Sequence, residues 1–271
     1  MTTPSTGAAM TLGAITLGTV ALSFHRATAA VARRVLEAHG HRVETIEAPH
    51  EQMFGLQASG QVDVLISAWL PSSHDTYLSG YRDRARVLAP HYNPYCVWAV
   101  PPYVPADQVS EVADLAKPEV AARMTALIDG INPGAGISRF SAAMVPAYGL
   151  DQVGYRFAPG TEAGFIARVE LGIAAREWFV IPLWRPQFLN RRHGLRPLTE
   201  PKGLLGTVDA ASPVVHEAAL DRIHPEALAR LDQLRLGNDG VEELDVWINA
   251  DGLTPLQAAD RFLAARPDLL R

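Results

Sequence analysis

The chain has 271 residues, of which 48% are hydrophobic and 20% charged, so it holds enough apolar material for one folded core or for two lobes. Its 24 basic and 29 acidic residues give a formal net charge of −5, without a long run of like charge. This charge pattern argues against nucleic acid or an anionic membrane as a partner.

An apolar stretch opens the chain at residues 8–24. It lacks the basic start of a secretion signal, because no side chain before His25 can carry positive charge, and its apolar residues alternate with Thr and Gly. We therefore predict a strand over residues 15–22. Two alternatives stay open: the gene product stays in the cytoplasm, or a signal has been removed from it. No other run approaches the roughly 18 apolar residues that a membrane span needs.

Short β-like runs then alternate with helical patterns, which indicates α/β layering. The helix at 27–39 has Ala27, Val31 and Val35 on one face and ends before Gly40. The first elements together predict a βαβαβ unit. Its strands are expected at 15–22, 43–46 and 62–67, and its helices at 27–39 and 53–58.

A second group of elements begins with a strand at 96–100. Pro101 and Pro102 follow it, and their stiffness suits a crossing between lobes. A turn at 132–136 leads into a helix that ends near Tyr148, and no sequence repeat links the two groups. The other elements predicted here are strands at 126–128, 155–158 and 178–183 and a helix at 161–176.

Beyond about Lys202 the pattern indicates helices alone. The last helix has the clearest start, because Thr254 can cap it, Pro255 suits its first position and Gln257 completes a capping box. We expect this helical tail to pack on the first lobe.

The chain offers little sign of catalysis or of a cofactor. The 132–136 turn lacks a P-loop lysine and the dinucleotide spacing, and the nine histidines do not fall at metal-ligand spacing. Ser138 lacks the second glycine of a nucleophile elbow. Cys96, the only cysteine, lies in an apolar run and is expected to be a small buried hydrophobe rather than a nucleophile. We predict no metal, no cofactor and no enzymatic activity.

Two tryptophans share a context that indicates a ligand. Trp69 and Trp184 each come after a predicted strand, and Pro71 or Pro186 follows two positions later. Ligands of open α/β sheets bind at the carboxyl ends of strands, so both indoles are expected to face a ligand. Core positions are expected for the other three tryptophans, Trp98, Trp178 and Trp247.

Several short motifs occur in a specific order along nearly the whole chain. They are 35–41, 54–56 with Gly60 and Asp63, 69–71 with His74 and Tyr77, 100–104, 130–136, 178–181, 184–186, 201–206, and 252–255 with Ala258 and Ala259. In these motifs the sequence resembles the substrate-binding proteins of ABC importers for glycine betaine, proline betaine, carnitine and choline.

The resemblance implies an α/β fold of the type II periplasmic-binding-protein kind, a two-lobed clamshell with a helical C-terminal tail. Residues 1–97 and 208–271 would form the first lobe and 98–207 the second, closing about crossings near 95–103 and 198–207. In this family tryptophans from both lobes enclose a quaternary ammonium by cation–π attraction, and Trp69 and Trp184 match box positions. It also implies ABC permease subunits as partners, a periplasmic or extracytoplasmic location, and a role in osmoprotection.

The sequence departs from the family at two places that bear on the ligand. After the first strand the family has a tryptophan and an acidic residue, whereas this chain has Ser23, Phe24 and His25. Where the family has Trp-x-Pro-His-Trp, this chain ends the motif with Gln187 and Phe188. Both changes weaken the case for betaine itself and favour a ligand with more hydrogen-bonding capacity.

Other polar residues complete the expected site. Ser23 and Thr161 stand where helices begin, so free backbone N–H groups there could receive a carboxylate. Glu162 could face a cation or be a solvated residue of a first helical turn, and Arg139 could face the ligand or the surface. The expected ligand-binding residues are Ser23, Phe24, His25, Trp69, Arg139, Thr161, Glu162, Trp184 and Gln187.

Three functions stay open. The first is a receptor that delivers a small zwitterion or quaternary-amine-like solute, of the glycine betaine, choline or carnitine class or a derivative, to an ABC permease. The second is a cytoplasmic ligand sensor of the same fold. The third is an enzyme on that scaffold, which would need a nucleophile or an acid/base group at the cleft, such as Cys96 or Glu162.

Overall fold

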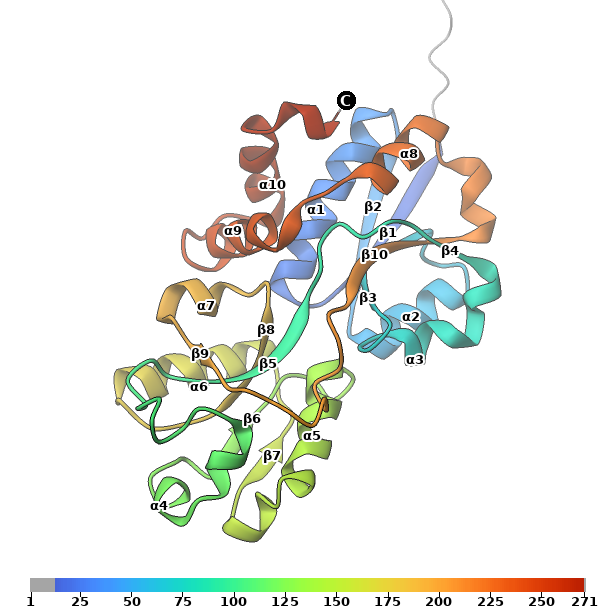
Figure 1. Cartoon of the computed structure of the whole chain (residues 1–271). Coiled ribbons are helices and arrows are strands. Elements are labelled where there is room, and N and C mark those ends of the chain that lie inside the picture. The colour runs from blue at the N-terminus through green and yellow to red at the C-terminus, as the bar shows by residue number, and fades with distance from the viewer. Residues whose placement is uncertain (1–12, 271) are drawn as a thin grey trace, which may run out of the picture.

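The computed structural model describes residues 13–270, which form two lobes joined by two chain segments (Figure 1). Residues 8–12 of the opening apolar stretch lie outside this range. The larger lobe is built on a five-stranded sheet with the order β2-β1-β3-β10-β4. Its strands are β1 Ala14–Val20, β2 Arg42–Ala48, β3 Val64–Leu70, β4 Ala85–Val87 and β10 Ala210–His216.

The predicted βαβαβ unit is confirmed. β1 pairs in parallel with both β2 and β3, and the connections are the helices α1 (Ser23–Ala38) and α2 (His50–Ala58). Two boundaries differ from the prediction. α1 begins at Ser23 rather than at residue 27, and β3 runs on to Leu70 although the polar Ser67 suggested its end. The strand continues because Ser67 is itself buried in the sheet, and Trp69 therefore lies inside β3.

The prediction that only helices follow Lys202 is wrong, because β10 lies in the middle of the main sheet. It pairs antiparallel with β3 on one side and with β4 on the other. Pro213 concealed it in the sequence, since proline is normally excluded from central strands. The structure tolerates this proline because the register between β10 and β3 shifts between Ser212 and Val214, which places Pro213 at an irregularity.

The smaller lobe has two short sheets. One has the order β8-β5-β9, with both pairings antiparallel, and in the other β6 and β7 are parallel. The strands are β5 Tyr95–Val100, β6 Leu127–Asp129, β7 Arg156–Ala158, β8 Ile181–Arg185 and β9 Arg196–Pro197. The helices are α4 Pro118–Ala121, α5 Gly136–Ala147, α6 Glu162–Ala174 and α7 Phe188–His193, while α3 Asp75–Leu78 belongs to the larger lobe.

The strand predicted at 178–183 begins later, at Ile181. Trp178 makes only an isolated bridge to Met124, and the Arg123 guanidinium lies 3.5 Å from the centre of its ring. Trp178 packs against the core, as expected, but it is only half-buried and the arginine covers its ring. Trp247 is also half-buried, whereas Trp98 is fully buried as expected.

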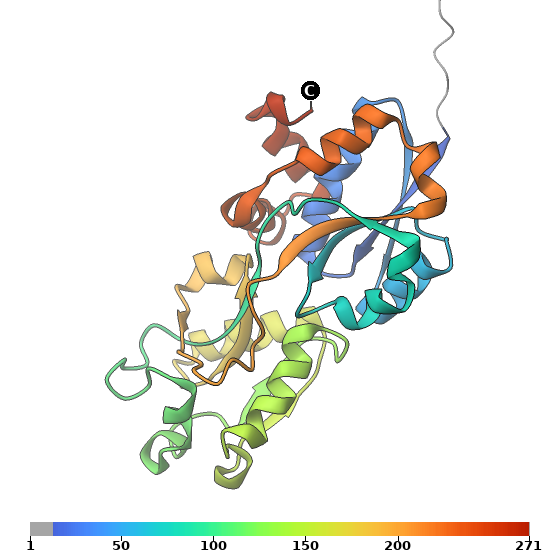
Figure 2. The same cartoon turned by 45° about the vertical axis from the view of Figure 1, so that its right-hand side comes forward.

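Two segments cross between the lobes. Residues 88–94 lead from β4 to β5, and residues 198–209 lead from β9 back to β10; Figure 2 shows both from the side. Two adjacent crossings of this kind leave the lobes able to move about them.

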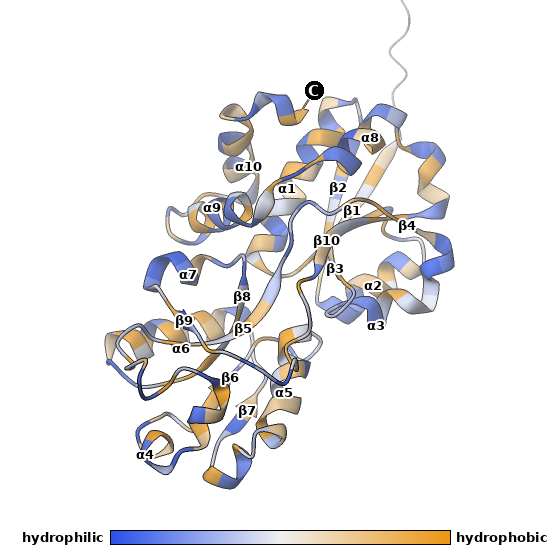
Figure 3. Ribbon diagram, viewed as in Figure 1, coloured by the Kyte–Doolittle hydropathy of each residue, from blue (hydrophilic) through white to orange (hydrophobic). Residues whose placement is uncertain are grey.

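The C-terminal helices pack on the larger lobe as expected. They are α8 Pro225–Gln233, α9 Gly237–Asn249 and α10 Pro255–Ala264, and all three contact α1. Each carries both hydrophilic and hydrophobic residues, as amphipathic helices do (Figure 3). Within residues 13–270 no helix combines the length and the apolar character needed to cross a bilayer.

The predicted capping box of α10 is present, because Thr254 Oγ1 accepts from Gln257 N and Gln257 Oε1 accepts from Thr254 N. Replacing Thr254 with Ala should lower the free energy of unfolding by about 1 kcal/mol, measured by urea denaturation. The matched variant Thr254→Ser keeps the hydroxyl and should stay within a few tenths of the wild type. An equal loss in both variants would show that the hydroxyl does not stabilise the helix.

Candidate functional site

A small enclosed cavity lies between the two lobes. The ends of β3 and β8 and the starts of α1, α2 and α5 border it, and its volume is about 20 Å³. This is about the space of one water molecule. The residues that border it are Leu22, Phe24, His25, His50, Trp69, Ser73, His74, Ile131, Ala135, Gly136, Ile137 and Trp184.

Trp69 and Trp184 border the cavity from opposite lobes. Each is the penultimate residue of its strand, β3 or β8. The Phe24 ring lies between them, with its centroid 5.4 Å from that of Trp69 and 5.6 Å from that of Trp184. Trp69 Nε1 donates to Tyr92 Oη at 3.0 Å, whereas Trp184 Nε1 is buried without a partner among the described residues. The two indoles thus face one aromatic space, to which Phe24 adds a third ring.

Three histidines from the larger lobe form the polar part of the wall. The ring centroids of His25, His50 and His74 lie 5.1 to 6.4 Å apart. His74 Nδ1 accepts from the backbone N–H of Trp69 at 2.9 Å, and His50 Nδ1 lies 3.0 Å from Asn132 Oδ1 in the smaller lobe. Between residues 13 and 270, no three His, Cys, Asp or Glu side chains are arranged to hold a metal ion.

All three imidazoles are neutral at physiological pH. Burial lowers the pKa of His50 to about 4, and it holds the pKa values of His25 and His74 well below 6.5. His50 also lowers the pKa of both neighbours, because two imidazolium ions so close together would repel. The cavity wall therefore carries polar side chains and no charged one.

The first turn of α5 faces the cavity with free backbone donors. Ser138 N and Arg139 N both donate to Ala135 O, which leaves the N–H groups of Gly136 and Ile137 ahead of the first helical hydrogen bonds. A helix start of this kind favours an anionic group, because its unpaired N–H groups and the helix dipole both point at it. The arrangement can accept a carboxylate beside the aromatic rings.

A seam of carboxylates beside the cavity joins the lobes. Glu162, at the start of α6, accepts from Ser23 N at 2.9 Å and lies 3.5 Å from the Arg26 guanidinium. Asp245 on α9 accepts from Ser23 Oγ at 2.6 Å and from Phe188 N at 2.8 Å. The bond from Ser23 to Asp245 lies within the larger lobe, whereas those from Ser23 to Glu162 and from Phe188 to Asp245 join the two lobes.

The structure brings four of the nine expected residues to the cavity, namely Phe24, His25, Trp69 and Trp184. The other five do not border it. Ser23 and Glu162 belong to the seam, and Thr161 caps α6 by accepting from Gly164 N. Gln187 caps α7 by accepting from Leu189 N. Arg139 donates to Gly134 O in its own lobe and to Ser73 O and Tyr77 Oη across the lobes.

Several cavity residues were missing from the expected set. His74 and Gly136 stand inside the motifs that carry the family resemblance, so those motifs could have indicated them. His50 follows Pro49 at the start of α2, and no sequence signal distinguished it from a surface residue. Ile131 and Ala135 stand in the same 130–136 motif as Gly136, whereas Ile137 follows it.

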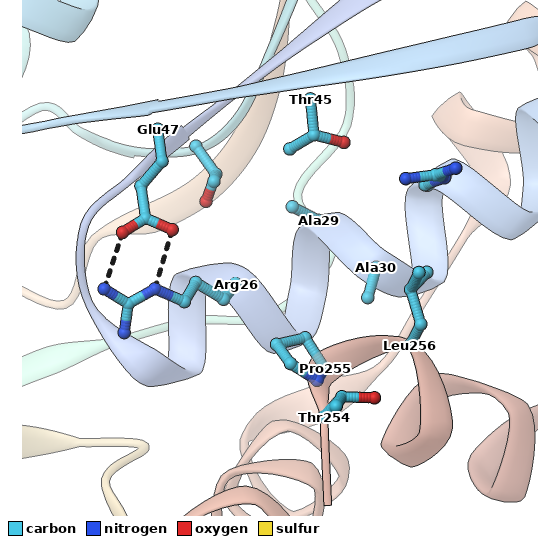
Figure 4. Close-up of a pocket in the computed structure, with 10 residues that line it drawn as sticks. Arg26, Ala29, Ala30, Thr45, Glu47, Thr254, Pro255 and Leu256 are labelled. Atoms are coloured by element: carbon cyan, nitrogen blue, oxygen red, sulfur yellow. Dashed lines mark hydrogen bonds and ion pairs between the residues drawn. The ribbon is translucent and has the colours of Figure 1, made fainter.

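A second hollow, of about 230 Å³, lies within the larger lobe among α1, β2 and α10 (Figure 4). Arg26 and Glu47 form a two-bonded ion pair at its edge, at 2.6 and 2.7 Å. No residue of the smaller lobe borders this hollow, so closure of the lobes does not shape it. The cavity between the lobes is the one that closure encloses.

A two-lobed α/β fold with a cavity between its lobes is the architecture of solute-binding proteins. The family model for the substrate binding domain of the ABC-type glycine betaine transport system matches residues 13–265. Because this match covers nearly the whole sequence, the chain belongs to that family.

Solved structures agree with this assignment. Lactococcal OpuAC, in its closed-liganded conformation with glycine betaine, is 25% identical, with a TM-score of 0.84 over 95% of this chain and 98% of that chain. An ABC-transporter choline binding protein with choline is 20% identical, with a TM-score of 0.83 over 95% and 90%. The glycine betaine/carnitine binding protein GbuC of Listeria monocytogenes is 24% identical over 153 residues, 56% of this chain and 50% of that protein. The chain thus matches about half the length of this relative.

Burial raises the pKa of Asp245 from 3.8 to about 7. Since the folded value lies above the unfolded one, ionisation destabilises the folded state, and stability falls as pH rises from about 4 to about 7. The side-chain amide of the variant Asp245→Asn cannot ionise. Between pH 5 and pH 7 the wild type should therefore lose about 2 kcal/mol relative to the variant, measured by urea unfolding. If the difference in the free energy of unfolding between the wild type and Asp245→Asn did not change with pH, the raised pKa would be contradicted.

Gly136 should control closure of the lobes. A Cβ built there would lie 2.8 Å from the Cβ and Oγ of Ser73 in the other lobe, so Gly136→Ala should disfavour closure by about 1–3 kcal/mol. The radius of gyration from small-angle X-ray scattering should rise in this variant. Gly55→Ala is the control, because a Cβ there meets nothing within 4 Å. An unchanged radius in Gly136→Ala would show that the lobes close without this contact.

Proposed function

We propose that the protein binds a small zwitterion without net charge between its lobes and delivers it to the permease of an ABC importer. The observation that carries this function is the composition of the cavity wall. Aromatic faces from both lobes, Phe24, Trp69 and Trp184, stand beside the free N–H groups of α5, and no charged side chain borders the cavity.

The two kinds of wall suit the two ends of a zwitterion. Aromatic faces attract a cation that lies within about 6 Å of the ring centroid, and methylated nitrogen is tolerated because this attraction needs no hydrogen bond. The start of α5, with Gly136 and Ile137, supplies donors for a carboxylate. A single solute can satisfy both only if its positive and negative groups are a few atoms apart.

The absence of charged side chains from the cavity wall favours a zwitterion over a simple cation. Burying a net charge without a countercharge costs several kcal/mol, whereas a zwitterion brings its own countercharge. The nearest carboxylates are already used, because Asp209 accepts from Ser73 Oγ and from the backbone of Ser72 and Ser73, and Asp245 accepts from Ser23 Oγ. A choline-like cation would therefore bind more weakly than a betaine-like zwitterion.

The size of the cavity favours a small solute. At about 20 Å³ it has room for about one water molecule, so the walls must separate to admit a solute. Separation of the lobes about the crossings 88–94 and 198–209 supplies that movement. Affinity then comes from desolvating the solute between lobes that close on it.

Transport rather than catalysis is supported by the state of the reactive groups. Ser73 Oγ donates to the Asp209 carboxylate at 2.7 Å rather than to a histidine, so the histidine base of a Ser–His pair is not in place. Burial raises the pKa of the Cys96 thiol, which keeps it protonated. Both features fit a binding role. The ABC transport system of the matching family supports an ABC permease as the partner and, with it, a location outside the cytoplasm.

The Trp69→Ala variant tests the binding function. Removing this aromatic wall should lower the affinity for a zwitterion such as glycine betaine or dimethylglycine by about tenfold to a hundredfold, measured by isothermal titration calorimetry. Trp247→Ala is the matched control, because Trp247 lies on α9 against Arg261 and does not border the cavity. Equal affinity in the wild type and Trp69→Ala would place the solute elsewhere.

A further inference from the structure

The histidine cluster gives the cavity an excess of unused hydrogen-bonding atoms. The Nδ1 atom of His25 is buried and makes no hydrogen bond within residues 13–270, and the whole side chain is 1% exposed. Trp184 Nε1, also buried, has no partner in the same range. Buried polar atoms of this kind destabilise the closed state unless a ligand or water satisfies them.

The hydrogen bonds of the other two histidines determine whether the Nε2 of each ring is a donor or an acceptor. His74 Nδ1 accepts from the N–H of Trp69, so the proton of the neutral ring is on Nε2 and makes it a donor. His50 Nδ1 must donate to Asn132 Oδ1, because that oxygen can only accept, and its Nε2 is then an acceptor. His25 can take either tautomer. The wall therefore holds at least one imidazole acceptor, and His25 can supply another.

These acceptors stand where the aromatic faces would hold a cation. The His25 ring centroid lies 5.6 Å from that of Trp69 and 4.3 Å from that of Phe24. A cation held over either ring within about 6 Å of its centroid is thus close to His25. A quaternary ammonium has no N–H group, so it would leave the imidazole nitrogens unsatisfied. An ammonium that keeps at least one hydrogen could donate to them.

We propose that the solute is a zwitterion whose cationic nitrogen retains at least one hydrogen, and that His25 selects it over the fully methylated analogue. This specificity rests on the function proposed above and names the ligand class of the same cavity. It differs from what the printed names of the relatives say of them, since glycine betaine and choline both carry a quaternary nitrogen. Trp184 Nε1 would donate to the acceptor end of the solute.

The size of the cavity also favours a solute with fewer methyl groups on its nitrogen. Each methyl group removed from the nitrogen reduces the volume that the closing walls must enclose, and the walls leave about 20 Å³ in the closed state. An N–H group exchanges its hydrogen bond with water for one with the imidazole, whereas a methyl group in its place leaves the buried imidazole without a partner.

Titration calorimetry with the series glycine betaine, dimethylglycine, sarcosine and glycine tests this specificity in the wild-type protein. The four solutes share one carboxylate and differ only in the number of methyl groups on nitrogen. Dimethylglycine or sarcosine should bind about tenfold tighter than glycine betaine. Tighter binding of glycine betaine than of every N–H-bearing member would overturn the inference and leave the binding function intact.

Two substitutions of His25 test the role of its ring nitrogens. His25→Phe keeps an aromatic ring and removes both nitrogens, so the preference for dimethylglycine over glycine betaine should fall to about onefold or reverse. His25→Asn restores an acceptor without the ring, so it should keep the preference at weaker affinity for both. A purely structural role of His25 would lower both affinities together and leave their ratio unchanged, which would count against selection by this residue.

The control for the same substitution is His39→Phe. His39 lies at the end of α1, where its Nδ1 bonds to Val35 O, and it does not border the cavity. The affinities of the His39→Phe variant for the four solutes should match those of the wild type. If none of the four solutes bound to the wild type, while other zwitterions also failed to raise the melting temperature, the binding function itself would be overturned.

Discussion

The contact of the Phe24 ring with Trp69 and Trp184 is the interaction on which the site depends, because it joins aromatic side chains from both lobes. Each indole is held at the end of a buried strand, and Phe24 is held by the first turn of α1. Neither lobe alone has an enclosed aromatic space. Closure creates the site, so the energy of binding and the position of the lobes are linked.

The seam beside the cavity shows how this linkage reaches the rest of the fold. The start of α1 supplies Phe24 and His25 to the cavity and Ser23 to the seam, so one helical turn serves both. Glu162 and Asp245 hold that turn from other helices. Because Asp245 is fully buried and Glu162 largely so, their carboxylates are costly to place there, which raises the pKa of each. The seam therefore stabilises the closed state only modestly, which suits a protein that must release its solute.

The sequence predicted the layered α/β fold, the βαβαβ unit and the capping box of α10, since each depends on local patterns. It did not predict β10, because Pro213 conflicts with a central strand and only the register shift against β3 accommodates it. Long-range pairing of this kind leaves little trace in a local window. The lobe boundaries at residues 97 and 207 stay predictions. The strands themselves place the connecting segments at residues 88–94 and 198–209.

The site shows the same division between local and long-range information. Trp69 and Trp184 could be predicted because a proline two positions later marks the end of each strand. Ser23 and Thr161 were correctly placed at or next to helix starts, yet their side chains bond within the protein rather than border the cavity. Gln187, expected from the family motif, likewise bonds within the protein. A helix start can be read from sequence, whereas the direction in which it points depends on the packing of both lobes. His50 depends wholly on that packing, because Asn132 of the other lobe fixes its ring.

A cavity whose wall combines neutral polar side chains with aromatic faces selects among ammonium groups differently from a cavity with aromatic faces alone. Cation–π attraction needs no hydrogen bond from the cation, so an aromatic box can hold quaternary and N–H-bearing ammonium groups. A buried imidazole without a partner adds a penalty that falls only on ligands unable to donate, and such penalties separate analogues more strongly than apolar contacts do. With His25 beside Phe24 and Trp69, the wall combines both effects within one space. The substitution of a histidine into an aromatic cage therefore changes which solute is selected while the fold and the closing movement stay the same.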